Sequence, residues 1–282
     1  GRPADHPLIV HLPDAEALPL WADRIPKEAI ALARVFWPGP LTLILKRSEE
    51  VPDIVTGGQD TVGLRVPNHP VALQLLKVFG SGIAAPSANR FGRISPTTAD
   101  HVREELGASV AIVLDGGPCQ VGIESTILDL SRDVPEILRP GAITPEAIAV
   151  VIGRMPVIRQ TTGGDAPRVS GALEAHYAPR TALRLVQSDR LREVLNMLRH
   201  RGARCAVIAT SQPALADQPH AWRMLPAEPA GYAHELYSAL RHADAAGAEL
   251  IVVEAPPSTA EWAAVNDRLR RAAAGAGNEP PP

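Results

Sequence analysis

The chain has 282 residues, of which 45% are hydrophobic and 21% charged, and its formal net charge at pH 7 is −3. These proportions are typical of a globular protein with a sizeable core, organised as one large or two ordinary domains. The small negative charge provides no global basic field for nucleic-acid binding, and no apolar run approaches the ~20 residues of a membrane-spanning helix. Cys119 and Cys205 share no metal-type spacing, which predicts two reduced thiols in a cytoplasmic protein.

Apolar strand-like runs and helical patterns alternate over residues 1–153. Pro70 and Pro145 stand at first-turn positions of two expected helices, and Thr144 is a suitable N-cap before Pro145. The expected strands are Leu8–Leu12, Leu41–Lys46, Thr61–Val66, Ile83–Ala85, Ala111–Leu114, Thr126–Leu130 and Glu136–Arg139. The expected helices are Pro26–Phe36, Pro70–Phe79, Thr97–Leu106 and Pro145–Ile152. Because several strands follow each other without a helix, the pattern predicts an α/β fold with a mixed twisted sheet.

This pattern disappears over residues 154–180, which are rich in Gly, Pro, Thr and Arg and are typical of an interdomain linker. A cleaner alternation follows over residues 181–275 and predicts a small Rossmann-like domain with a parallel sheet. Its expected strands are Leu183–Val186, Cys205–Ala209, Trp222–Leu225 and Leu250–Glu254. Its expected helices are Asp189–His200, Tyr232–Ala246 and Thr259–Ala274. Residues 276–282 are expected to form a disordered tail.

The common nucleotide and serine-hydrolase motifs are missing from the sequence. It contains no G-x-x-x-x-G-K-[ST], no G-x-G-x-x-G and no G-x-S-x-G. Hydroxyl side chains gather instead in the stretch "AAPSANRFGRISPTTADHV" (84–102), which is far longer than the roughly 2–6 residues of a plain strand-to-helix connection. Reversing the chain between a strand and a helix does not require a connection of this length and composition, which indicates a further role for it.

Arg65 and Arg139 both sit at strand ends close to a proline, and a guanidinium is suited to bidentate capture of a carboxylate or phosphate. The two arginines beside hydroxyl-rich loops favour an anionic small-molecule ligand. The loop "DGGPCQVGIESTILDL" fits anion-binding backbone amides and a plain hairpin loop equally well. A lone histidine such as His11 is more often structural than a ligand. Tyr177 in the linker either stacks on a base or pins the linker to a domain.

Several stretches together resemble a known family. "GRPADHPLIVH", "FWPGPLTLIL", "VGLRVPNHP", "APSANRFGRISPTTA", "GIESTILDL" and "LRPGAIT" occur in the order and at the separations of the YrdC-like domain of threonylcarbamoyl-AMP synthases. The linker's "HYAP" and the following Rossmann-like domain resemble the two-domain form of that family. The resemblance implies synthesis of threonylcarbamoyl-AMP and pyrophosphate from L-threonine, bicarbonate and ATP. Partner proteins would then use this adenylate to modify ANN-decoding tRNAs.

The resemblance also implies roles for individual residues. The ATP contacts would be Arg2, His6, Thr61, Ser87, Asn89, Ser95, Arg139 and Tyr177. The threonine contacts would be His11, Arg65, the backbone around Ala85, and Ser125. Magnesium would be carried by ATP, with no protein ligand assigned. Because the substrate provides the nucleophile, the reaction requires no catalytic serine or cysteine, and the linker would close over the site to exclude water.

The first residues depart from the family pattern, which reads Lys-x-Arg-Pro, whereas this sequence begins Gly1-Arg2-Pro3. The interpretation from sequence is an N-terminally truncated chain that lacks the lysine and is weakly active or inactive. Two alternatives come from other functional classes. One is an RNA-binding YrdC-like module without adenylate-forming activity, against which the net charge argues. The other is the carbamoyl-transfer domain of a hydrogenase-maturation enzyme, which would bring zinc-finger cysteines or an acylphosphatase-like domain.

Overall fold

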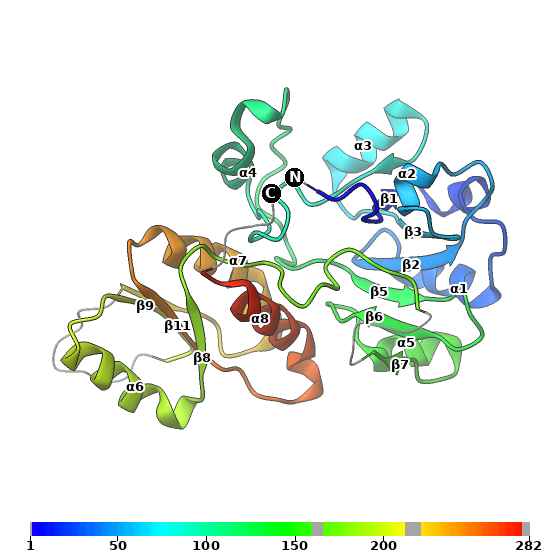
Figure 1. Ribbon diagram of the computed structural model, residues 1–282. Coiled ribbons are helices and arrows are strands. Elements are labelled where there is room, and N and C mark those ends of the chain that lie inside the picture. The colour runs from blue at the N-terminus through cyan, green and yellow to red at the C-terminus, as the bar shows by residue number, and fades with distance from the viewer. Residues whose placement is uncertain (1, 160–165, 212–220, 278–282) are drawn as a thin grey trace.

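The computed structural model describes residues 2–159, 166–211 and 221–277, which form two α/β units joined by the linker (Figure 1). The first unit is built on a mixed seven-stranded sheet with the order β4-β1-β3-β2-β5-β6-β7. Its strands are β1 Ile9–His11, β2 Leu41–Lys46, β3 Thr61–Arg65, β4 Ile83–Ala84, β5 Thr126–Asp129, β6 Glu136–Arg139 and β7 Val157–Ile158. β1 runs parallel to β3, β2 to β5 and β6 to β7, whereas the other neighbours are antiparallel.

One face of this sheet packs on helices. The helices of the unit are α1 Lys27–Phe36, α2 Asp53–Thr56, α3 Pro70–Phe79, α4 Ala99–Leu106 and α5 Pro145–Ile152, with 3-10 turns η1 Ala15–Leu20 and η2 Gly107–Ser109. Leu43 and Leu64 from the strands meet Leu32 of α1 and Ile148 of α5 in one buried cluster. Since strand side chains alternate between faces, these positions leave a second set of residues on the opposite face.

The linker covers that opposite face. Ile44 of β2, Ile127 of β5 and Leu138 of β6 are buried together with Val169 of the linker. The linker is therefore packed against the sheet over the part that the structure describes, and it does not hang free between the units.

The second unit has a four-stranded sheet with the order β10-β9-β11-β8, parallel throughout. Its elements are β8 Leu183–Val186, α6 Ser188–His200, β9 Cys205–Ala209, β10 Ala221–Met224, α7 Pro229–Ala245, β11 Leu250–Glu254, η3 Ala260–Trp262 and α8 Ala263–Gly275. α6 packs on one face, and α7 and α8 pack on the other, between the sheet and the first unit (Figure 1). This confirms the predicted Rossmann-like parallel sheet.

Most expected elements are present. Pro70 and Pro145 occupy the first turns of α3 and α5, and the Ala147 amide donates to Thr144 Oγ1 at 3.2 Å, as expected of an N-cap. Thr98 likewise caps α4. No helix in the described ranges is long and apolar enough to cross a membrane. Of the expected tail, residues 278–282 lie outside the described residues.

Two predictions about strands are wrong. Residues 111–114 form no strand, and Ile112 and Leu114 are 78% and 58% exposed. An apolar run becomes a strand only where a neighbouring strand takes up its backbone hydrogen bonds, and none lies beside this one in the described part of the chain. Conversely, Val157 and Ile158 of the expected linker form β7, because the free edge of β6 accepts them.

Candidate active site

Four of the residues predicted to bind ligand lie at the same end of the strands of the seven-stranded sheet, here named the strand edge. His11 and Arg65 end the parallel strands β1 and β3 and are direct register partners. Ser125 immediately precedes β5, and Arg139 ends the antiparallel neighbour β6. The sequence separates these residues by up to 128 positions, but strand pairing brings them to the same edge.

Arg139 and Ser125 are in direct contact. Arg139 donates from Nε and Nη2 to the Ser125 carbonyl at 3.1 and 2.9 Å and from Nη2 to Ser125 Oγ at 3.1 Å. Ser125 Oγ also lies 2.7 Å from Thr42 Oγ1. A residue predicted to contact ATP thus shares a hydrogen-bond network with a residue predicted to contact threonine, so the two predicted sites adjoin.

Arg65 is half-buried and Arg139 is buried, and the charge of Glu124 acts on Arg139 without forming an ion pair with it. Arg65 donates to the Gly39 carbonyl at 2.9 Å, and the remaining bond of Arg139 goes to the Ser170 carbonyl at 2.9 Å. Among the described residues, neither forms an ion pair with a carboxylate. Burial, followed by the like charge of Arg139, lowers the pKa of Arg65 to about 10, against a small opposing effect of Cys119. Two partly desolvated cations held together are a site prepared for an anion.

The histidines at this site are neutral at pH 7. Burial lowers the pKa of His11 to about 4, and the charge of Arg65 lowers it as well. Burial also lowers the pKa of His6 to about 4, where the charges of Arg2 and Arg168 outweigh that of Asp5. A neutral imidazole can accept a hydrogen bond through one ring nitrogen. Neither histidine adds to the positive charge of the site.

A second group of predicted ATP residues lies around Phe91. Arg2 Nη2 is 3.4 Å from both the carbonyl and Oγ of Ser87, and its guanidinium lies 5.4 Å from the Phe91 ring centre. The His6 ring meets the same phenyl ring edge-on at 5.1 Å. Asn89 Nδ2 donates to the Arg93 carbonyl at 2.7 Å, while its buried Oδ1 lacks a partner in the described structure. The sequence reading missed Phe91, which joins Arg2 to His6.

Two predicted residues lie apart from these groups. Thr61 is at the start of β3, the strand that Arg65 ends, and it lines a small cavity beside linker residues Val169 and Ser170. The Ala85 amide donates to the Ile9 carbonyl at 2.9 Å, which continues the β1–β4 pairing inward from His11. The structure therefore does not bring all the predicted ATP residues into one cluster.

Tyr177 is buried between the two units. Its ring packs 5.5 Å from that of Tyr237 and 4.2 Å from that of His176, and its backbone has a φ of 60°, an uncommon value outside glycine. Burial raises the pKa of Tyr177 to about 12. Of the two roles left open by the sequence, this position matches the anchor that pins the linker to a domain.

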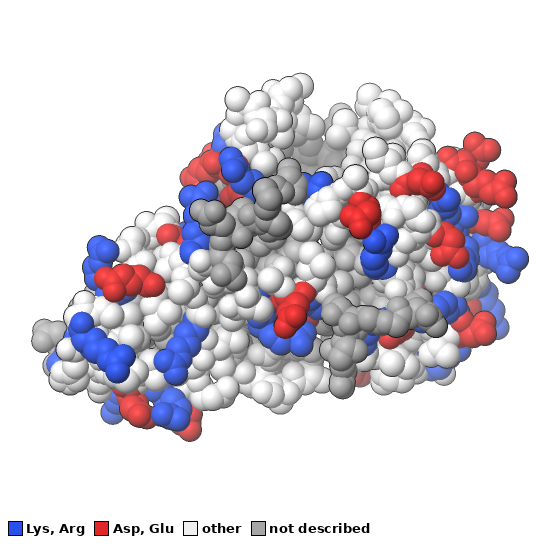
Figure 2. Space-filling view, viewed as in Figure 1, with Lys and Arg blue, Asp and Glu red and all other residues white. Residues whose placement is uncertain are grey.

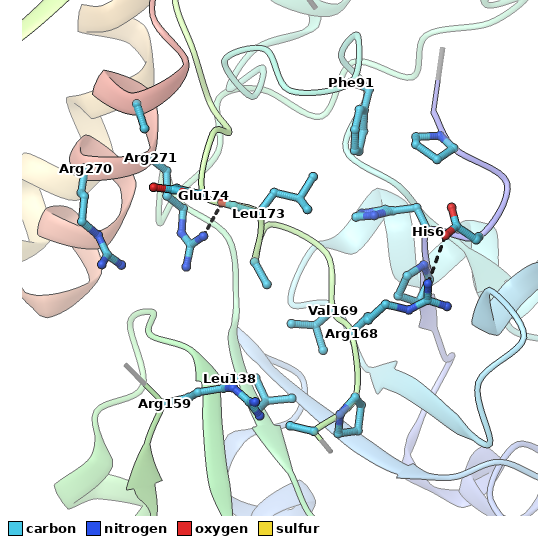
Figure 3. Close-up of a pocket in the computed structure, with 17 residues that line it drawn as sticks. His6, Phe91, Leu138, Arg159, Arg168, Val169, Leu173, Glu174, Arg270 and Arg271 are labelled. Carbon is cyan, nitrogen blue, oxygen red and sulfur yellow. Dashed lines mark hydrogen bonds and ion pairs between the residues drawn. The ribbon is translucent and has the colours of Figure 1, made fainter. Parts of the chain in front are cut away.

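The linker segment before Tyr177 contacts both units. Toward the first unit, Arg168 pairs with Asp5 at 3.0 Å, and Ser170 Oγ donates to the Pro7 carbonyl at 3.1 Å. Toward the second unit, the Leu173 carbonyl accepts a hydrogen bond from Arg271 of α8. These contacts line a cavity of about 760 Å³. Figure 3 shows the linker running across it, with His6 and Phe91 on one side and α8 on the other.

Glu124 is the site-adjacent residue that the sequence reading missed most clearly. It accepts hydrogen bonds from Ser95 Oγ at 2.6 Å, Tyr237 Oη at 2.9 Å and Arg268 Nε at 2.9 Å. Burial raises the pKa of its carboxyl, but the charges of Arg268 and Arg139 outweigh this and hold that pKa at about 2. The sequence did contain a signal for this residue. A carboxylate inside a loop interpreted as anion-binding would repel the anion unless a cation from elsewhere in the chain pairs with it.

The carboxylates nearest these residues do not form a magnesium site. Asp5 pairs with Arg168, and Glu124 is taken up by Arg268 and its two hydroxyl donors. Within the described ranges, no group of three or more His, Cys, Asp or Glu could hold a metal ion. The described residues therefore offer no cluster that would hold Mg²⁺ by itself.

Two family models match nearly the whole chain. One described as "Telomere recombination" matches residues 1–141, and one described as "Threonylcarbamoyl-AMP synthase, C-terminal domain" matches residues 143–274. The boundary between the two matches falls just before α5, which packs with the first unit.

Similar proteins include two threonylcarbamoyl-AMP synthases. That of Pyrococcus abyssi is 39% identical over 96% of this chain and 81% of its own length, and that of Bacillus subtilis is 38% identical over 98% and 81%. The crystal structure of P. abyssi Sua5 complexed with L-threonine superposes with a TM-score of 0.89 at 39% identity, covering 98% of this chain and 82% of that one. Nothing in these matches supports the expectation that the chain is inactive.

The RNA-binding alternative gains nothing from the visible surface. Figure 2 shows Lys and Arg interspersed with Asp and Glu over this face, without a continuous basic band. The similarities and the pair Arg65 and Arg139 both favour a small-molecule site.

Proposed function

The chain belongs to the threonylcarbamoyl-AMP synthase family, and on that basis we propose that it joins L-threonine, bicarbonate and ATP into threonylcarbamoyl-AMP, releasing pyrophosphate. The observation that carries the site assignment is the pair Arg65 and Arg139, neither of which forms an ion pair with a carboxylate among the described residues. Threonine carries a carboxylate and ATP carries phosphates, and an anionic group between these guanidiniums offsets their repulsion.

Threonine would bind at the strand edge. Its carboxylate would meet Arg65, with Ser125 and the backbone at Ala85 providing further hydrogen bonds. The neutral His11 imidazole beside Arg65 can accept a hydrogen bond from the amine. A neutral amine is the form that attacks, so a site without extra positive charge at this position suits the chemistry.

ATP would occupy the adjoining side, with Arg2, His6, Ser87 and Arg139 around its polar groups. The amine and bicarbonate give a carbamate and water, and a carbamate oxygen then attacks the α-phosphorus as the bond to pyrophosphate breaks. The substrate provides the nucleophile, so the protein contributes positioning and stabilisation of charge. We propose that magnesium enters with ATP as part of that substrate, without protein ligands.

The linker would protect the intermediate. A carbamate decomposes in water, and residues 166–174 already lie against the sheet and α8. Part of this linker has to yield space to substrates, since Val169 and Ser170 line the small cavity beside Thr61. We further propose that the chain works in the cytoplasm and that tRNA-modification proteins consume the adenylate.

The test is pyrophosphate release from the purified chain with threonine and bicarbonate omitted in turn. Loss of release in each omission supports the proposed reaction. Release without threonine would reject it, and RNA binding that weakens steeply with salt in the absence of such release would favour the RNA-binding module. Chain lacking residues 154–180 should release no pyrophosphate; unchanged turnover would reject the role of the linker.

A further inference from the structure

We propose that the C-terminal unit shapes the ATP site by positioning Ser95 through Glu124. The proposal rests on the proposed function, because the contact between Ser95 and ATP does. It gives the Rossmann-like unit a role in the binding of a substrate.

The side chain of Ser95 is held by residues of the second unit acting through one carboxylate. Ser95 Oγ donates to Glu124 Oε1 at 2.6 Å. The other oxygen, Oε2, accepts from Tyr237 Oη of α7 and Arg268 Nε of α8, each at 2.9 Å. Arg268 is fully buried, and Ser95 is only 6% exposed. The direction of the Ser95 hydroxyl is therefore set where the two units meet.

The backbone of the same segment is also held by α7. Arg241 donates from Nη2 to the Ile94 carbonyl at 2.5 Å and from Nε to the Ser95 carbonyl at 3.4 Å. Its Nη1 forms a partly buried ion pair with Glu105 of α4 at 3.2 Å. Loop, side chain and following helix are thus fixed by one face of the second unit.

The chemistry of the carboxylate makes this arrangement directional. Arg268 and Arg139 keep Glu124 ionised, with a pKa of about 2, so it can only accept hydrogen bonds at neutral pH. A serine hydroxyl can donate only one hydrogen bond, and here Ser95 donates it to Glu124. Ser95 therefore presents its lone pairs to a ligand in a fixed orientation. A neutral amide in place of Glu124 can donate to Ser95 and reverse that bond.

The experiment is a double-mutant cycle on the whole chain with Ser95→Ala and Glu124→Gln. Because a single hydrogen bond contributes about 0.5–1.5 kcal/mol, each variant should raise the KM for ATP roughly threefold to tenfold, and the KM for threonine should not change. The double variant should be no worse than Ser95→Ala, since Glu124 acts through the serine. A purely structural Glu124 would give additive effects.

A more conservative substitution tests the same contact in case Glu124→Gln misfolds. Glu124→Gln leaves the buried Arg268 without its full partner and could unfold the chain, which circular dichroism would reveal. Tyr237→Phe removes only one donor and should raise the KM for ATP about threefold, again only while Ser95 is present. The matched control is Arg223→Gln, which breaks the exposed pair with Glu235 on the same unit and should change neither KM.

The outcomes separate this proposal from the proposed function. Additive effects, or an unchanged KM for ATP in Ser95→Ala, would overturn the role of Glu124 while threonine-dependent pyrophosphate release still stands. If the unaltered chain releases no pyrophosphate, the proposed function fails, and calorimetric ATP dissociation constants over the same cycle decide the coupling without turnover. Failure of the unaltered chain to bind ATP would overturn both.

Discussion

Two pairs of arginines in this molecule have opposite environments. At the strand edge, Arg65 and Arg139 donate to neutral carbonyls and have no carboxylate ion-pair partner among the described residues. On α8, Arg268 and Arg271 are neutralised by Glu124 and Asp267 at 2.9–3.0 Å. Arg139 is buried as deeply as the two arginines of α8 and Arg65 is partly exposed, so the main difference lies in what completes the charge balance.

The positive charge of Arg65 and Arg139 is available to bind a ligand, whereas carboxylates of the protein itself balance the charge of Arg268 and Arg271. Burying an unpaired cation is costly, and proteins tolerate it where binding later offsets the cost. The α8 pair is complete in the protein itself and fastens the second unit to the first. Removing single residues from each pair should therefore have opposite consequences for stability and activity.

The largest expected effect is on stability at α8. Arg268→Met leaves Glu124 buried without its main cation, and breaking such a pair costs about 3–5 kcal/mol of unfolding free energy. Arg65→Met should change it by less than about 1 kcal/mol, because relief of repulsion offsets the lost hydrogen bond. Urea unfolding followed by circular dichroism measures both. Equal losses in the two variants would contradict the comparison.

The next effect is the pH dependence of the unfolding free energy, which differs between the two regions. The folded pKa of His11 is about 4, below the ordinary 6.5, so its contribution is complete above pH 6.5 and is lost as the pH falls toward 4. The loss is on the order of 3 kcal/mol and should shrink in His11→Gln. Glu124, held at about 2, contributes fully above its ordinary 4.5 and loses its effect only between there and 2. Stability curves that fall only below pH 4.5 would contradict the assignment to His11.

The third effect is on activity at the strand edge. Arg65→Met should lower kcat/KM for threonine about 100-fold, because a hydrogen bond to a charged group contributes about 1.5–3 kcal/mol. Arg65→Lys keeps the charge without the planar fork and should recover part of the loss. Steady-state pyrophosphate release measures both. Full activity in Arg65→Met would show that the uncompensated charge is not kept for substrate.

The smallest effect is stabilisation by an anion. Pyrophosphate at ten times its dissociation constant should raise the unfolding free energy by about 1.4 kcal/mol. The gain should fall in Arg139→Lys, which keeps one charge but loses the planar fork, and persist in Arg223→Gln. Denaturation at constant ionic strength, with chloride as the reference anion, tests it. An equal gain in all three proteins would indicate a nonspecific salt effect.

Local pattern predicted most of the elements. Proline at a first helical turn acts within a few residues, so α3 and α5 begin where the sequence indicates, and threonine caps α5. Residues 111–114 show the limit, because an apolar run does not reveal whether a partner strand exists. Val157 and Ile158 show the converse, since only the free edge of β6 turns a linker segment into a strand.

The sequence by itself determined the α/β class, the two units and, through its motifs, the family and the residues that resemble a threonine and ATP site. Only the tertiary structure decided that His11, Arg65, Ser125 and Arg139 share one sheet edge, and that Glu124 joins Ser95 to α7 and α8. The physical reason is that motifs and periodicity are local in the chain. Burial and charge balance depend on which distant residues meet, and at Glu124 the partners come from 29 to 144 positions away.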